Sequence, residues 1–264
     1  MKISVIGAGM VGSCVSFLLA KELIGADIVL VDIDVKKAKA EALDIGQGII
    51  YSGNSCILGA GIEGIKESDI VVITAGAKQN VGEKRESLRD RNEKIMQKIT
   101  NDIKKYSPLA KIIVATNPVD EMVEVVRKSL LGVNSFVIGT GTELDSYRFR
   151  YYLGKYFKVC PKSIRADVLG LHNEKAKFVW SRVLIGEMTL SEFLQRENIL
   201  FNDEIKSEIE NRVIKSAFEI IEGKGATYWA IAEVTSEIVK SIVANRRCVF
   251  NVSVGEFGSM AMPL

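Results

Sequence analysis

The chain has 264 residues, and its 35 Lys and Arg residues against 33 Asp and Glu give a formal net charge of +2. This length accommodates one or two domains with a sizeable core, and the near-balanced charge gives no reason to expect a nucleic acid or a membrane as a partner. The only His, His172, excludes sites built from two or more His of one chain, including His-rich zinc sites, and we predict no metal site. His172 is also the one side chain whose ordinary pKa suits acid–base chemistry near neutral pH.

The four Cys residues are scattered along the chain, and none has C-x-x-C spacing. Neither a zinc ribbon nor a thioredoxin-type redox pair is therefore predicted. The first residues are not a signal peptide, because glycines interrupt the place where an unbroken apolar region is needed. No apolar run reaches the roughly 18–20 residues of a membrane span. We expect a soluble, cytoplasmic protein.

The first half of the chain alternates short apolar runs with stretches of helical pattern. Strand-length runs lie at 3–6, 28–31, 70–73, 111–115 and 136–138, and helical patterns lie at 11–22 and 35–43. Val/Ile runs without polar alternation are typical of strands that are buried on both faces. Their alternation with helices predicts an α/β fold with a doubly wound parallel sheet of the Rossmann type.

The second half of the chain has a different pattern. Helices are predicted at 143–156, 203–221 and 226–244, and strands at 163–169 and 248–254. This pattern predicts an α+β domain with antiparallel strands, so we place the two domains at 1–142 and 143–264. Because no Pro- or Ser-rich linker separates them, we expect the two domains to pack closely.

A glycine-rich motif, G-x-G-x-x-G, follows the first strand run, with its glycines at Gly7, Gly9 and Gly12. In the dinucleotide-binding fingerprint these glycines permit a tight turn, approach of a pyrophosphate and close packing of the helix on the strand. The acid expected about 20 residues further on is Asp32, which can accept hydrogen bonds from a ribose diol and would repel a 2′-phosphate. The motif therefore predicts NAD as the cofactor; the alternative is a structural turn beside a solvated Asp.

Two further loops follow strand runs, at the edge where open α/β sheets bind ligands. The loop 74–85 is polar and ends with basic residues, which suits either a lid that closes over an anion or an ordinary solvated connection. Asn117, before Pro118, exposes an amide at the same edge, or simply belongs to a turn in which Pro starts the next helix.

Asp145 and Arg148 are three residues apart, so on a helix they share a face and can pair. Such pairs usually lie at the surface; the functional alternative is that both face inward, with the acid towards a His and the Arg towards a substrate carboxylate. His172 lies in a loop just beyond a predicted strand, where a lone His is more often structural or exposed than catalytic.

Taken together, these motifs resemble the L-lactate/malate dehydrogenase family over essentially the whole chain. The resemblance rests on GAGMVG, Asp32, TAGAKQNVGEKR from Thr74, NPVD from Asn117, GTGTELDSYRFR from Gly139, the His172 loop and KGATYWA from Lys224. It implies hydride transfer between NAD and a small L-2-hydroxy acid in a homodimer or homotetramer. The cofactor site it implies comprises Gly7, Gly9, Met10, Val11, Gly12, Asp32, Thr74, Ala75, Gly76 and Asn117.

The resemblance also implies roles for individual residues. His172 resembles the general acid/base, and Asp145 the carboxylate that orients its imidazole. Arg148 resembles the fork that grips the substrate carboxylate, and Arg85 the loop arginine that polarises the carbonyl. In addition, Asn117 would help to place nicotinamide and substrate, and Thr227 would line the substrate pocket.

The position that usually separates the substrates of this family holds Gln79, where malate dehydrogenases tend to carry Arg. A neutral amide leaves a second substrate carboxylate unpaired, which favours pyruvate and L-lactate over oxaloacetate and malate. Two alternatives remain: a malate dehydrogenase, since Lys78 or Lys84 could supply the charge, and a nucleotide-binding homologue without catalysis.

The sequence also departs from the family pattern. Asn173 and Glu174 follow the His where the family usually has Gly-Asp, and family members normally continue through another strand and helix beyond Leu264.

Arg150 and Arg165 match positions that bind a sugar-bisphosphate activator in some bacterial relatives; the alternative is two solvated or ion-paired arginines.

Overall fold

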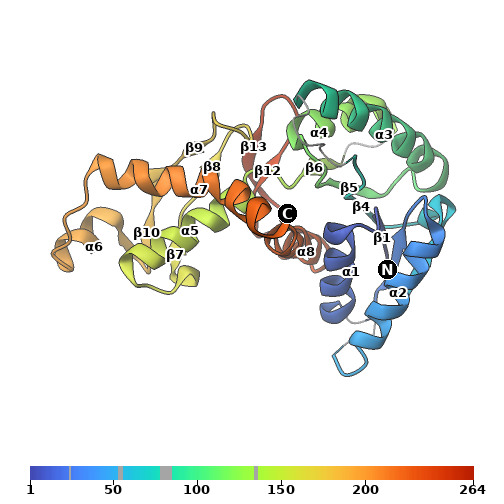
Figure 1. Ribbon diagram of the computed structural model, residues 1–264, viewed down its shortest axis with the longest axis horizontal. Helices are drawn as coiled ribbons and strands as arrows, with labels where there is room; N and C mark the ends of the chain where they lie inside the picture. The colour runs from blue at the N-terminus through green and yellow to red at the C-terminus, as the bar shows by residue number, and fades with distance from the viewer. Residues whose placement is uncertain (24, 53–55, 78–84, 134–135) are drawn as a thin grey trace.

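The computed structural model describes all residues except 24, 53–55, 78–84 and 134–135. Figure 1 shows an elongated molecule with a sheet-centred lobe at the N-terminal half of the chain and a smaller lobe built around α5 (Glu143–Phe157), α6 (Leu190–Arg196) and α7 (Asp203–Lys224). Between the lobes lie α8 (Trp229–Val243) and the strands β12 (Val249–Ser253) and β13 (Ser259–Pro263).

The larger lobe is built on six parallel strands in the order β3-β2-β1-β4-β5-β6. This is the strand order of a dinucleotide-binding sheet, in which the direction of winding reverses between β1 and β4. The predicted doubly wound Rossmann sheet is thus confirmed. The strands are β1 (Lys2–Ile6), β2 (Asp27–Val31), β3 (Cys56–Ala60), β4 (Ile70–Ile73), β5 (Lys111–Val114) and β6 (Val137–Gly139).

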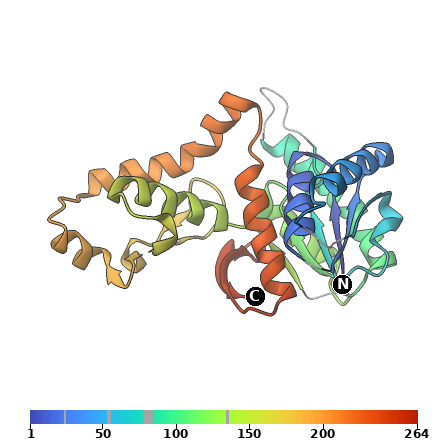
Figure 2. The ribbon, with the colours of Figure 1, turned by 90° about the horizontal axis from the view of Figure 1, so that it is seen from below.

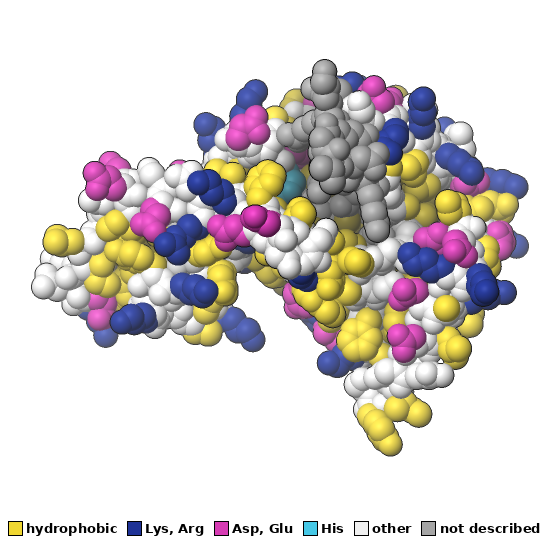
Figure 3. Space-filling model, viewed as in Figure 1, with side chains coloured by type: hydrophobic (Ala, Val, Ile, Leu, Met, Phe, Trp, Pro, Cys, Tyr) yellow, Lys and Arg dark blue, Asp and Glu magenta, His cyan; other side chains and the backbone are white. Residues whose placement is uncertain are grey.

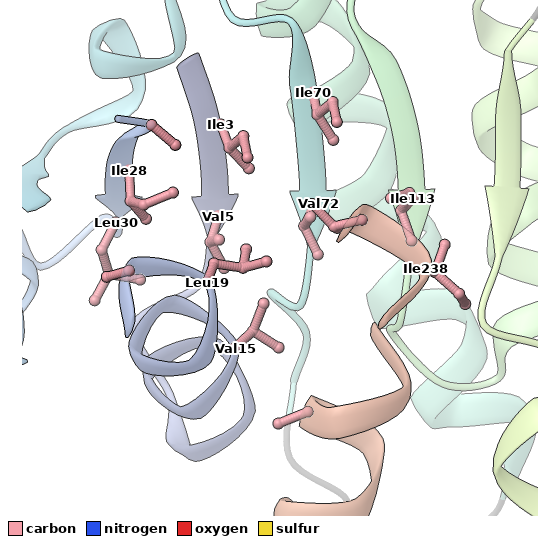
Figure 4. Close-up of a cluster of buried hydrophobic side chains, with 14 of the residues drawn as sticks. Ile3, Val5, Val15, Leu19, Ile28, Leu30, Ile70, Val72, Ile113 and Ile238 are labelled. Carbon is pink, nitrogen blue, oxygen red and sulfur yellow. The ribbon is translucent and has the colours of Figure 1, made fainter. Parts of the chain in front are cut away.

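Helices cover both faces of this sheet because its central strands are apolar on both sides. On β4, Val72 joins a core with α1 (Met10–Glu22), α2 (Val35–Gly48) and α8, whereas Ile73 joins a core with α3 (Arg85–Tyr106) and α4 (Val119–Ser129). Figure 4 shows Val15 and Leu19 of α1 directed at the strand residues of the first core. Each fully buried side chain of this kind contributes about 1.5–3 kcal/mol.

The smaller lobe has its own core around Phe149, which is fully buried and makes edge-to-face contacts with Phe178 and Trp180. Its strands are short and antiparallel: β7 (Ile164–Arg165), β10 (Leu184–Ile185) and β11 (Met188–Thr189) form one sheet, and β8 (Val168–Leu169) and β9 (Lys177–Phe178) form another. The single strand predicted at 163–169 is therefore wrong in detail, since β7 and β8 belong to different sheets.

The last two strands return to the sheet of the larger lobe. β12 and β13 form an antiparallel hairpin, and Ser253 of β12 pairs with Gly139 of β6, which extends the sheet to eight strands. Figure 2 shows α8 between this hairpin and α1, and α8 shares the first core with α1. The predicted boundary at Thr142 falls immediately before α5, but the residues from α8 onward pack on the same sheet as the first half.

In the described part of the chain, no helix is both long and apolar enough to cross a membrane.

Candidate active site

The glycine-rich turn lies between β1 and α1 in the form that a dinucleotide requires. A Cβ on Gly7 would lie 2.7 Å from the Ala75 backbone nitrogen, and a Cβ on Gly12 would lie 1.8 Å from the Gly7 carbonyl oxygen. Gly9, in contrast, precedes α1 without a side-chain cap, and no described atom lies within 4 Å of its Cβ position. The first amides of α1, from Met10 onward, are thus left for an anion. These residues fit the pyrophosphate of NAD.

Asp32 at the end of β2 is held against this turn. Its Oδ2 accepts a 2.7 Å hydrogen bond from the Ala8 amide, and its Oδ1 accepts a 2.9 Å hydrogen bond from the Asp34 amide. The carboxylate is only partly buried, so its remaining lone pairs can accept hydrogen bonds from a ribose diol. The predicted pair of glycine-rich turn and acid is therefore brought together by β1 and β2, which are adjacent parallel strands.

The backbone that follows β4 and β5 continues this edge of the sheet. The Thr74 hydroxyl lies 3.1 Å from the Gly7 carbonyl oxygen, so the predicted cofactor residues 74–76 adjoin the glycine-rich turn. The Thr116 hydroxyl donates a 2.8 Å hydrogen bond to the Ala75 carbonyl. A Cβ on Gly76 would approach the Thr116 side chain to 2.6 Å, so these two loops run in close contact.

Asn92 of α3 joins the same two loops and was not predicted from the sequence. Its side-chain oxygen accepts a 2.7 Å hydrogen bond from the Ala77 amide, and its side-chain nitrogen donates a 2.7 Å hydrogen bond to the Asn117 carbonyl. The Asn92 residue is 1% exposed, whereas Asn117 is exposed at the sheet edge. The one available signal was a polar residue at an inward position of an amphipathic helix. Periodicity alone does not distinguish such a residue from those on the polar face of the helix.

Part of the predicted site lies in a segment whose position is not described. Gln79, Lys78 and Lys84 are outside the described residues. Arg85 is the first residue of α3, but the placement of its side chain is also outside the described structure. The roles of Gln79 and Arg85 remain predictions.

His172, Asp145 and Arg148 form a cluster at the junction of the two lobes, where Figure 3 shows the cyan His side chain at the surface. Asp145 Oδ2 lies 2.6 Å from His172 Nδ1, and Asp145 Oδ1 lies 3.4 Å from an Arg148 guanidinium nitrogen. The Asp145 and Arg148 side chains are only 13% and 11% exposed. Both therefore face inward, as the functional alternative required, and a surface ion pair is excluded.

The environment of His172 favours its charged form. Burial lowers the pKa of the imidazole, but the hydrogen bond and the negative charge of Asp145 outweigh burial and raise the pKa above its ordinary value. Arg148 opposes this rise and Asp120 adds to it. Because Nδ1 is engaged by Asp145, Nε2 is the ring nitrogen available for proton exchange.

In the described part of the chain, no group of three or more His, Cys, Asp or Glu side chains is arranged to hold a metal ion.

The loop that carries His172 is fixed at both of its sides. Gly170, at φ +87°, exchanges two backbone hydrogen bonds of 3.1 and 2.7 Å with Ser259 of β13. Two residues later, the His172 amide donates a 2.8 Å hydrogen bond to Asp120 Oδ2 on α4. After the His, the Asn173 side chain accepts a hydrogen bond from the Lys175 amide, which stabilises the turn at the position where the sequence departs from the family pattern.

Two other predicted positions make no hydrogen bond or ion pair with this cluster among the described residues. Thr227 is half-buried in the connection between α7 and α8, without a hydrogen bond to the other predicted residues that the structure describes. Arg150 directs its guanidinium into the protein, towards the Ala166 carbonyl at 3.0 Å, Asp167 at 3.2 Å and Glu143 at 3.5 Å. These contacts favour the ion-paired alternative for Arg150 over an activator site.

Comparison with known proteins extends these observations over the whole chain. Residues 1–139 match the family model of the lactate/malate dehydrogenase NAD binding domain, and residues 142–263 match that of the lactate/malate dehydrogenase alpha/beta C-terminal domain. An L-lactate dehydrogenase of Chloroherpeton thalassium is 35% identical over 266 aligned positions, which cover 100% of this chain and 87% of the relative. One of Clostridium botulinum strain Loch Maree is 36% identical, over 96% of this chain and 79% of the relative.

Solved structures agree. A lactate dehydrogenase from a Medee basin deep-sea metagenome library superposes with a TM-score of 0.90 at 29% identity, covering 99% of this chain and 86% of that chain. A malate dehydrogenase of Cryptosporidium parvum has a TM-score of 0.90 at 28% identity, over 100% of this chain and 86% of that chain. With its dinucleotide turn, its His–Asp–Arg cluster and both family domains in chain order, this chain belongs to the lactate/malate dehydrogenase family.

Proposed function

We propose that this chain is an NAD-dependent L-2-hydroxy-acid dehydrogenase that interconverts L-lactate and pyruvate. The observation that carries the proposal is the inward-facing cluster of His172, Asp145 and Arg148, with 2.6 Å between the His172 and Asp145 side chains. A proton-exchanging group and a carboxylate-binding group within one cluster suit a substrate that bears a hydroxyl next to a carboxylate. The relatives named L-lactate dehydrogenase point to the same reaction.

The cofactor site would be formed by the glycine-rich turn and the loops beside it. The α1 amides after Gly9 would bind the pyrophosphate, and Asp32 would accept hydrogen bonds from the adenosine ribose. Residues 74–76 and Asn117 would lie along the nicotinamide half. Bound NAD supplies the hydride acceptor for oxidation and, as NADH, the hydride donor for reduction.

His172 would move the proton in both directions. In oxidation its neutral Nε2 takes the C2 hydroxyl proton as the C2–H bond breaks, and the resulting imidazolium is stabilised by Asp145 at Nδ1. In reduction the same imidazolium returns the proton to the carbonyl oxygen. Asp145 keeps the imidazole in the tautomer with Nδ1 protonated.

The charged groups around His172 would orient the substrate. Arg148 presents a planar fork that can bind the C1 carboxylate through two parallel hydrogen bonds. We propose that Arg85 polarises the C2 carbonyl, that Asn117 places substrate and nicotinamide relative to each other, and that Thr227 lines the side-chain pocket. The burial of Arg148 and Asp145 strengthens their charge interactions relative to water.

The choice between pyruvate and oxaloacetate is proposed to depend on Gln79. A neutral amide offers no counter-charge to a second carboxylate, whose burial without a partner costs several kcal/mol. We expect Gln79→Arg to shift the ratio of kcat/KM values towards oxaloacetate by about tenfold or more. Steady-state rates with both oxo acids measure this ratio, and an unchanged ratio would assign the selectivity to another residue, with malate dehydrogenase as the alternative function.

The proposal is tested by the loss of NADH absorbance with a panel of 2-oxo acids. Turnover is expected with pyruvate, and His172→Asn is expected to lower kcat about 10²–10⁴-fold while NADH still binds. A wild-type chain that binds NADH but turns over no oxo acid would instead be the non-catalytic homologue.

The remaining parts of the proposal concern assembly and location. We propose a homodimer or homotetramer in the cytoplasm. Large apolar side chains exposed on the single chain support an assembly, among them Tyr51 at 100% and Phe218 at 71% exposure, and the four free Cys suit a reducing compartment. Light scattering of the purified protein measures the mass, and a monomer at micromolar concentration would contradict the oligomer.

A further inference from the structure

Asp120 is a buried carboxylate that the reaction scheme above does not use. It lies in the first turn of α4 and is 6% exposed. Its Oδ2 accepts a 2.8 Å hydrogen bond from the His172 amide, and its Oδ1 accepts a 2.6 Å hydrogen bond from the Ser253 hydroxyl on β12. Both oxygens are therefore engaged, by residues 52 and 133 positions away in the sequence.

A helix-capping role does not explain this burial. An acid in the first turn of a helix stabilises it through the helix dipole, but this effect does not require burial. Glu121 occupies the same turn and is exposed to solvent, so the turn already has an acid for that role. Burying a carboxylate is unfavourable unless it is well hydrogen-bonded, which makes the contacts of Asp120 with the His172 loop and β12 the feature that needs explaining.

The contacts place Asp120 at the meeting point of three parts of the site. α4 follows directly from Asn117, which we propose to lie beside the nicotinamide, and the His172 loop carries the proton-exchanging group. β12 lies between β13 and β6 in the sheet of the larger lobe, and its Ser253 hydroxyl also accepts a long hydrogen bond of 3.4 Å from the Gly255 amide. Asp120 thus connects the His172 backbone to the helix that directly follows Asn117.

We propose that Asp120 is a positioning residue, which tethers the His172 backbone to α4 and adds a second negative charge near the imidazole. Asp145 engages the ring at Nδ1, whereas Asp120 engages the amide of the same residue, so the two acids fix the ring orientation and the loop position separately. This inference rests on the proposed function of His172 as the proton-exchanging group.

Three variants separate the tether from the charge. Asp120→Ala removes both, Asp120→Asn keeps an oxygen that can accept from the His172 amide but removes the charge, and Glu121→Gln removes a charge from the same turn as the matched control. Each variant is measured for kcat and KM with pyruvate, for NADH affinity and for thermal unfolding. Because the chain has one His, ¹³C-labelled His gives a single ring signal whose pH titration reports the pKa of His172 without any turnover.

Among the residues that the structure describes, the charged groups that act on His172 are Asp145 and Arg148 on α5 and Asp120 on α4. Removing the Asp120 charge is therefore expected to lower the titration midpoint by about half a pH unit in both Asp120 variants. Asp120→Ala is also expected to lower kcat about tenfold to hundredfold, as displacement of a catalytic group by about 1 Å does. Asp120→Asn recovers most of kcat at its own optimal pH, and Glu121→Gln behaves as wild type.

Either of two results overturns the inference. The first is a kcat of Asp120→Ala within about twofold of that of Glu121→Gln, since a twofold change corresponds to only about 0.4 kcal/mol. The second is a His172 titration midpoint in Asp120→Asn equal to that in Glu121→Gln. A purely structural role would lower the unfolding temperature without moving this midpoint. If Asp120→Ala does not fold, the midpoint in Asp120→Asn decides. The titration and NADH binding need no substrate, so a failure of the lactate assignment is distinguishable from a failure of this inference.

Discussion

Replacement of Asp145 by Asn tests the electrostatic design of the His172 site most directly. The change removes the negative charge 2.6 Å from Nδ1 while it preserves the shape of the side chain. A hydrogen bond between two charged groups is worth about 1.5–3 kcal/mol, and one pKa unit corresponds to about 1.4 kcal/mol. The pKa of His172 should therefore fall by about 1–2 units. Burial and the charge of Arg148, which both lower this pKa, are then unopposed by Asp145.

The lowered pKa of His172 should shift the pH dependence of pyruvate reduction. Reduction of pyruvate needs His172 protonated, so its kcat/KM falls as pH rises through the pKa of His172, and in Asp145→Asn this fall should begin about 1–2 pH units lower. Initial rates of NADH consumption from pH 5 to 9 trace this limb. Asp167→Asn is the matched control, because Asp167 is a hydrogen-bonded carboxylate paired with Arg150 rather than with His172.

The result that would refute this reasoning is an alkaline limb at the same pH in Asp145→Asn and in wild type. In that case the pKa that governs the rate would belong to another group, and the hydrogen bond at Nδ1 would have only a structural role. A uniform loss of rate at every pH, with the limb unmoved, would give the same answer.

Further predictions concern carboxylate binding and the glycine-rich turn. Arg148→Lys should lower kcat/KM for pyruvate about 10–100-fold, because Lys cannot reproduce the bidentate fork, and steady-state kinetics measures the loss; a change below about threefold would contradict it. Gly9→Ala should weaken NADH binding about tenfold without a change in stability, because its Cβ would meet no described atom within 4 Å. Gly12→Ala should lower stability by about 1–3 kcal/mol, since its Cβ would lie 1.8 Å from the Gly7 carbonyl oxygen. Calorimetry and NADH titration of this pair check both outcomes, and equal unfolding temperatures would contradict the packing argument.

Elements with strong local signals could be predicted from the sequence. The Val/Ile runs of β1, β2, β4 and β5 are buried on both faces, so each carries the continuous apolar signal of a central parallel strand. β3 was missed because it lies at the edge of the sheet, is only partly buried and contains Gly59.

The contacts within the site depended on tertiary structure to different degrees. Asp145 and Arg148 could be grouped because they lie on one helix face. A His partner for Asp145 was one of two alternatives at that point, and the resemblance to a family favoured it. Asp120 and Asn92 gave no comparable signal, since an acid after Pro118 reads as an ordinary helix start and an Asn in a charged helix reads as solvated. Their burial results from elements that are distant in the sequence, which periodicity does not report.

The pairing of β12 with β6 bears on the order in which the protein folds. The edge of the sheet at Gly139 is completed by Ser253, so the whole smaller lobe is synthesised between two strands that become neighbours. Contacts of such long sequence separation form slowly, because loop closure costs entropy before the contacts offset it. Until β12 arrives, the hydrogen-bonding groups of β6 are open to strands of other chains, as in aggregation. The hairpin that helps to hold the His172 loop through Ser259 is therefore also the element that closes this vulnerable edge during synthesis.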